Sequence, residues 1–148
     1  MKQCSFLFVL ICILLNSVSC REKLPETYYF FPENKVNANY KLVIIPIGEG
    51  FNLISEFDNA YIDNPLIIGE VSKKWVFTKK SDVMPCGYEY SLILVDDSKI
   101  ITEKYLNFDC GYLGGWIYFP KYYLLKYKSH FKKFSPEELY EFYDPYNP

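Results

Sequence analysis

The sequence YEYSLILV at residues 88–95 is the most strongly strand-forming stretch of the chain. It joins aromatic and β-branched residues to an apolar run, which favours a strand buried in a sheet. Asp96, Asp97 and Ser98 follow it and are typical turn residues, so we expect a hairpin into a second strand at residues 99–102. No metal site is expected at the two aspartates, because no further oxygen ligands follow at the spacing of a calcium-binding loop.

More strands are expected on both sides of this hairpin. Residues 40–47 (YKLVIIPI) are rich in β-branched side chains, and residues 51–57 (FNLISEF) alternate apolar and polar positions after a Gly-Glu-Gly turn. The other expected strands are residues 66–69 and 74–78, and residues 116–119 are a further apolar run. Residues 103–115 are expected to form an irregular loop, because they contain Gly111 and the pair Gly114-Gly115.

Two helices are expected near the C-terminus. Aromatic residues recur at every fourth position from Phe119 to Phe131, which places them on one side of a helix over residues 120–133. We expect this row to pack on the sheet; the alternative is a basic amphipathic helix resting on an anionic membrane. Ser135, followed by proline and then Glu138, predicts the start of a second, short acidic helix. The expected fold class is therefore α+β, with an antiparallel sheet of about five or six strands packed against C-terminal helices.

The first 20 residues have the features of a secretory signal peptide. Lys2 precedes an apolar run at residues 6–15, and the small-residue segment 16–19 ends at Cys20. The apolar run is shorter than the roughly 20 residues that a membrane-spanning helix needs. We therefore expect residues 1–19 to be removed, residues 20–39 to form a tether, and residues 40–148 to form a single α+β domain.

Val18, Ser19 and Cys20 resemble the lipobox of bacterial lipoproteins. In that family the cysteine thiol carries a diacylglyceryl group and becomes the first mature residue, so the resemblance implies lipidation of Cys20 and attachment to a membrane. Arg21 is not the aspartate that retains many lipoproteins in the inner membrane, which favours the outer membrane. The alternative is an ordinary secreted protein, because cleavage after Ser19 also suits the usual signal peptidase. The mature domain resembles small uncharacterised bacterial lipoproteins, and this similarity implies no activity.

The number of cysteines agrees with the predicted lipidation of Cys20. Of five cysteines, Cys4 and Cys12 belong to the signal peptide, and lipidation would occupy Cys20. Cys86 and Cys110 then remain as one candidate disulfide, which export to an oxidising compartment allows. Two buried free thiols are the alternative, because the sequence does not supply the distance between their Cα atoms.

Composition and motifs narrow the function classes. The formal net charge is −2, and removal of Lys2 makes the mature chain more negative, which argues against nucleic acid as a partner. The glycine pattern of a dinucleotide site, the nucleophile elbow, the zinc-protease motif and the CxxC pair are all missing from the sequence. His130 lies among lysines and is interpreted as a surface residue. We therefore expect no enzyme activity, no cofactor and no metal.

The expected function is that of a lipid-anchored envelope protein that binds another protein, with an immunity or inhibitor role as one version. An alternative is a glycan-binding lipoprotein in which exposed aromatic side chains stack on sugar rings. The candidate ligand-contact residues are Tyr28, Tyr29, Phe30, Phe31 and Trp116. The first four are also compatible with a short strand or a patch docked on the core. An envelope hydrolase is a further alternative, which would need a cleft with perturbed ionisable groups.

Overall fold

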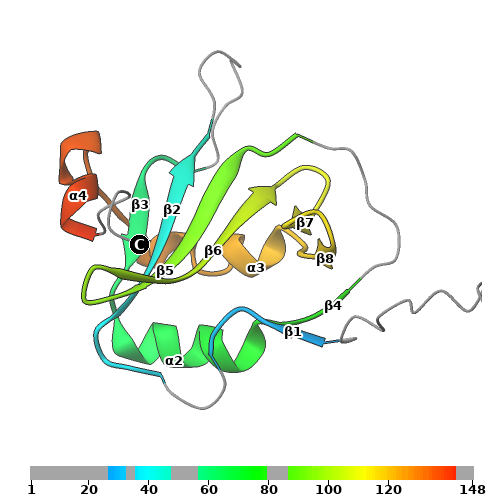
Figure 1. The fold of residues 1–148 in the computed structure, drawn as a ribbon, viewed down its shortest axis with the longest axis horizontal. Helices are drawn as coiled ribbons and strands as arrows, with labels where there is room; N and C mark the ends of the chain where they lie inside the picture. The colour runs from blue at the N-terminus through cyan, green and yellow to red at the C-terminus, as the bar shows by residue number, and fades with distance from the viewer. Residues whose placement is uncertain (1–26, 33–35, 48–56, 80–86, 143–148) are drawn as a thin grey trace, which may run out of the picture.

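The computed structural model describes residues 27–32, 36–47, 57–79 and 87–142. Within these ranges the main sheet has seven antiparallel strands in the order β8-β7-β6-β5-β2-β3-β9, and a small sheet pairs β1 with β4 (Figure 1). The strands are β1 (Thr27–Tyr29), β2 (Tyr40–Pro46), β3 (Ala60–Ile62), β4 (Val76–Thr78), β5 (Tyr90–Asp96), β6 (Lys99–Asn107), β7 (Tyr112–Leu113), β8 (Ile117–Tyr118) and β9 (Lys132–Lys133). The predicted α+β class with an antiparallel sheet is confirmed, although the sheet is wider than the five or six strands expected.

The hairpin of β5 and β6 forms the centre of this sheet. Asp97 and Ser98 both have positive φ angles, 44° and 69°, as a two-residue turn between antiparallel strands requires. The predicted turn is therefore confirmed. β6 continues to Asn107, beyond the predicted end at residue 102, and part of the predicted loop at 103–115 forms β7.

Both faces of β2 and β5 are buried, against different partners. On the first face Leu42, Ile44, Leu92 and Leu94 belong to the main core. On the second face Val43, Ile93 and Val95 form a smaller cluster with Phe134 and Phe142. Because side chains alternate along a strand, this arrangement explains why the sequence of β5 is apolar at nearly every position.

Helix α2 (Pro65–Lys74) overturns the prediction of a strand at residues 66–69. Asn64 caps its first turn by accepting hydrogen bonds from the backbone N–H groups of Leu66 and Ile67. Ile68 and Val71 are buried one turn apart, so the helix packs its apolar side into the main core. Figure 1 shows α2 on the side of the sheet where β1 and β4 lie.

The helix expected over residues 120–133 is also wrong in extent. It is replaced by the short helix α3 (Tyr122–Leu125), a 3-10 turn (Lys128–His130) and the edge strand β9, which pairs with β3. The second predicted start is confirmed: a capping box begins the 3-10 turn Pro136–Glu138, which leads into α4 (Leu139–Phe142). Among the described residues, none of the helices is long and apolar enough to span a membrane.

The small sheet belongs to the same fold. A bridge between Lys79 and Ile117 joins the end of β4 to β8, and Phe30, Phe31 and Phe77 are buried in the main core. Residues 27–31, which fall inside the predicted tether of residues 20–39, therefore contribute a strand and core side chains. Residues 48–56 lie outside the described ranges, so most of the predicted strand at 51–57 cannot be compared, but Phe57 is buried.

Candidate functional site

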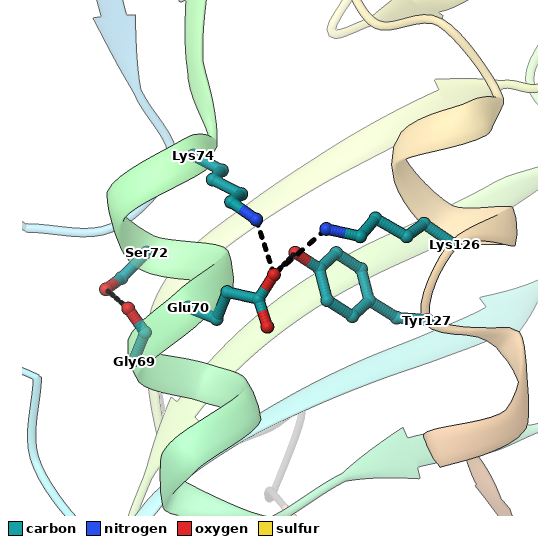
Figure 2. A network of polar contacts seen from close by, with 6 residues as sticks. All are labelled: Gly69, Glu70, Ser72, Lys74, Lys126 and Tyr127. Carbon is teal, nitrogen blue, oxygen red and sulfur yellow. Dashed lines mark hydrogen bonds and ion pairs between the residues drawn. The ribbon is translucent and has the colours of Figure 1, made fainter.

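A polar cluster on α2 joins this helix to the segment after α3 (Figure 2). Oε1 of Glu70 accepts hydrogen bonds from Lys74, from Lys126 at 2.9 Å and from the hydroxyl of Tyr127 at 3.1 Å. These donors lower the pKa of the Glu70 carboxyl from 4.5 to about 2. Lys74, Lys126 and Tyr127 all donate to Glu70, so we interpret this cluster as a structural contact between α2 and the segment after α3.

Ion pairs also neutralise three of the lysines that made residues 120–133 look like a basic amphipathic helix. Lys126 pairs with Glu70, Lys132 with Asp63 and Lys133 with Asp58. Neutralising these three lysines removes much of the electrostatic attraction to anionic lipid on which the alternative of a membrane-resting helix depends.

A second candidate surface lies at β6 and β8 and at Tyr88, which precedes β5. The half-exposed side chains of Tyr88, Tyr105 and Tyr118 have exposed fractions of 44%, 48% and 45%. Leu106, Leu113 and Ile117 of these strands belong to the main core, so the alternating residues, Tyr105 on β6 and Tyr118 on β8, point to the opposite face. We call Tyr88, Tyr105 and Tyr118 the tyrosine surface.

Backbone geometry positions the pair Tyr88 and Tyr105. Their ring centroids are 5.5 Å apart with an interplanar angle of 40°. Gly115, in the turn between β7 and β8, has a φ of 76°, and a Cβ at this position would lie 3.1 Å from the Tyr88 hydroxyl. The glycine therefore permits the turn and leaves room for the tyrosine.

An acidic group adjoins this aromatic pair. Glu103 precedes Tyr105 by two positions on β6, so both side chains lie on the same face, about 7 Å apart along the strand. The hydroxyl of Ser91 on β5 donates a hydrogen bond to Oε1 of Glu103 at 2.8 Å. Ser91 is buried while Glu103 is exposed, so a fixed hydroxyl orients a solvent-facing carboxylate.

The predicted ligand-contact residues differ in how far they are buried. Phe30 and Phe31 are buried in the core beside Trp75, where no ligand can stack on them. Tyr28 is partly buried and packs on the core, with the Lys104 ammonium 5.9 Å from the centroid of its ring. Tyr29 and Trp116 are 47% and 48% exposed and stay available to a ligand.

The cysteine predictions fall mostly outside the described ranges. Cys20 and Cys86 both lie there, so lipidation and the predicted pairing stay predictions. Cys110, in the turn between β6 and β7, is disulfide-bonded. Because the other cysteines of the chain all lie outside the described ranges, its partner is one of them.

The described residues contain no group of three or more histidine, cysteine or acidic side chains that could hold a metal ion. The Asp96 and Asp97 carboxylates instead accept hydrogen bonds from Asn37 and Asn39. His130 is an exposed residue of the 3-10 turn.

The sequence predictions included Trp116 but missed Tyr88, Tyr105, Ser91 and Glu103. No clear local signal marked them, because residues 103–107, Glu-Lys-Tyr-Leu-Asn, do not alternate regularly between apolar and polar side chains. Comparisons with protein-family models, curated proteins and solved structures found no match.

Proposed function

We propose that the chain is a non-catalytic, lipid-anchored protein of the bacterial cell envelope that binds another protein through the tyrosine surface. The observation that carries the proposal is the grouping of half-exposed tyrosines on the β6–β8 end of the sheet. Tyrosine is enriched in protein interfaces because it gives a large, rigid contact area together with a polar hydroxyl. An immunity or inhibitor role, in which the partner is a toxin or hydrolase, is one version of this function.

The packing of the C-terminal segments supports this assignment. Phe134 and Phe142 cover Val43, Ile93 and Val95 on the second face of the sheet. In Figure 1, α4 lies near β3, at the opposite end of the sheet from β7 and β8. In this proposal the C-terminal helices complete the core at one end, and a partner binds the half-exposed Tyr88 and Tyr105 at the other end.

Site-specific photocrosslinking tests the proposal. A photoreactive phenylalanine analogue would replace Tyr105 in cells that export the protein, with the same replacement at Tyr140 as a matched control. Tyr140 is 63% exposed and lies on α4, away from the tyrosine surface. We expect one dominant crosslinked protein from position 105 and little from position 140.

The same preparation tests the anchor. Mass spectrometry of the N-terminal peptide should show a lipid-modified Cys20 as its first residue, and the protein should partition with membranes. An unmodified Cys20 in the soluble fraction would overturn lipid anchoring. Equal, unspecific crosslinking from positions 105 and 140 would overturn the binding surface.

Glycan binding is the second candidate, because Trp116 and Tyr29 are exposed aromatic side chains. Aromatic rings present an apolar face on which a sugar ring can stack. The two tryptophans differ usefully, since Trp75 is 1% exposed and Trp116 is 48% exposed. A sugar stacked on Trp116 should change the tryptophan fluorescence, and Trp116→Phe should remove that change; an identical response in the variant would contradict glycan stacking at Trp116.

A further inference from the structure

The acidic group beside the tyrosine surface points to the chemistry of its partner. β5 is buried along most of its length and otherwise apolar through its centre, yet it contains Ser91. Among the described residues, Ser91 and Asn107 are the polar side chains that are buried. A buried hydroxyl needs a hydrogen-bond partner, and Ser91 finds one in Glu103.

This arrangement fixes a negative charge without neutralising it. Among the described residues, the salt bridges that form do not include Glu103. Ser91 donates a neutral hydrogen bond to one carboxylate oxygen, so the charge of Glu103 stays available to a cation. Lys104, the next residue, belongs to the opposite face and lies over the ring of Tyr28.

We propose that Tyr88, Tyr105 and Glu103 together bind an arginine side chain of the partner protein, an inference that rests on the proposed function. A guanidinium group stacks on a tyrosine ring and at the same time donates hydrogen bonds to a carboxylate. The pair of rings offers the stacking face, and the carboxylate held by Ser91 offers the acceptor. A lysine ammonium has no planar face to stack, so the surface favours arginine over lysine.

Charge complementarity also favours a cationic group. The chain has a net charge of −2, and Lys104, the lysine next to Glu103 in the sequence, lies on the opposite face over the ring of Tyr28. An anionic partner group would be repelled by Glu103, and an apolar group would leave its carboxylate without compensation.

A titration followed by NMR tests the inference with defined probes. Nα-acetyl-arginine amide would be added to the ¹⁵N-labelled protein, and Nα-acetyl-citrulline amide would serve as the uncharged analogue of the same shape. We expect saturating chemical-shift changes for the amides of Tyr88, Glu103 and Tyr105 with arginine and none with citrulline. The lysine analogue should bind more weakly than the arginine analogue.

Matched variants separate charge from folding. Glu103→Gln should weaken arginine binding about fivefold, as expected for loss of one exposed charge contact, whereas Asp109→Asn, at another exposed acid, should leave it unchanged. Ser91→Ala should weaken binding by releasing the carboxylate, and Ser91→Thr should restore it because the hydroxyl returns. The result for each Ser91 variant is valid only if its ¹⁵N spectrum is unchanged outside the tyrosine surface, which shows that the variant is folded.

Three results would overturn the inference: shifts that are absent or scattered, an equal response to citrulline or lysine, and an unchanged affinity in Glu103→Gln. The crosslinking experiment keeps the two proposals apart. A partner crosslinked at position 105 without any arginine response would reject arginine recognition and keep the protein-binding function. An arginine response without a crosslinked partner would reject the protein-binding function and keep the site.

Discussion

Nζ of Lys126, the residue directly after α3, lies 2.9 Å from Oε1 of Glu70 on α2. The two residues are 56 positions apart in the sequence, so their contact joins two segments that the chain brings together only on folding. Tyr127 donates to the same oxygen while its ring is buried in the main core. Glu70 is therefore the point at which the polar surface of α2 is attached to the C-terminal part of the fold.

Stability should depend on pH through this carboxyl. Its pKa falls from 4.5 to about 2 in the folded protein, so its contribution is present above pH 4.5 and is lost as the pH falls toward 2. We expect Glu70→Gln to be less stable than the wild type at pH 7, with a difference that shrinks between pH 4.5 and 2. Urea unfolding at several pH values measures this difference.

Two lysine variants, one of a residue that contacts Glu70 and one of a control residue on α2, test this role. Lys126→Met removes a donor to Glu70 and should reduce the pH dependence in the same range. Lys73→Met removes an exposed lysine that forms no salt bridge with another described residue, and should leave it unchanged. A difference between wild type and Glu70→Gln that stays constant from pH 7 to pH 2 would contradict the assigned role.

Two positions on the second face of the sheet should respond differently to truncation, because one is buried and the other is half-exposed. Ile93 is fully buried in the second cluster, and Ile93→Ala should lower the free energy of unfolding by about 2 to 5 kcal/mol through the cavity it leaves. Tyr105, on the same face, is 48% exposed, and Tyr105→Ala should cost about 1 kcal/mol or less. A loss above about 3 kcal/mol for Tyr105→Ala in denaturant unfolding would make Tyr105 a core residue.

The cap of the last helical segment gives a third prediction. The backbone N–H of Ser135 donates to Oε2 of Glu138 at 2.6 Å, and this segment carries Phe142 into the second cluster. Glu138→Ala should cost about 1 kcal/mol, whereas Glu138→Gln keeps an acceptor oxygen and should cost less. Equal losses for the two variants in equilibrium unfolding would show that the hydrogen bond is not the cause.

The central hairpin could be predicted because its signals are local. Asp97 and Ser98 are turn residues that accept positive φ, and the residues before them form an apolar run that suits a buried strand. The helical start at Ser135 could also be predicted, because a capping box lies within four consecutive residues. Such features need no contact with distant parts of the chain.

The secondary-structure predictions failed where tertiary contacts determine whether a segment forms a helix or a strand. The β-branched residues after Pro65 suggested a strand, but the Asn64 cap and the spacing of Ile68, Val71 and Trp75 fit the helix that forms. The aromatic row from Phe119 to Phe131 does face the core, as its spacing suggested. Its helix ends early because residues 132 and 133 pair with β3, a contact that the local sequence does not encode.

The candidate site was missed for a related reason. Tyr88 and Tyr105 meet only because β5 and β6 pair in one register, and a shift of one residue would exchange the faces of Tyr105 and Leu106. Ser91 and Glu103 are 12 positions apart, so their hydrogen bond follows from the same register. Residue spacing alone could not show this register or which face of β6 is exposed.

The disulfide of Cys110 gives the last prediction. Nδ2 of Asn107 donates to the carbonyl of Gly87, which places the residue after Cys86 beside the turn that carries Cys110. This contact supports the predicted Cys86–Cys110 pairing, and closing a loop of that length should stabilise the fold by about 3 to 4 kcal/mol in the chain-entropy model. Cys86→Ala, Cys110→Ala and the double variant should then lose about the same stability, because each removes one shared bond. Reduction of the wild type should reproduce that loss in denaturant unfolding, and a Cys86→Ala variant as stable as the wild type would assign Cys110 to another partner.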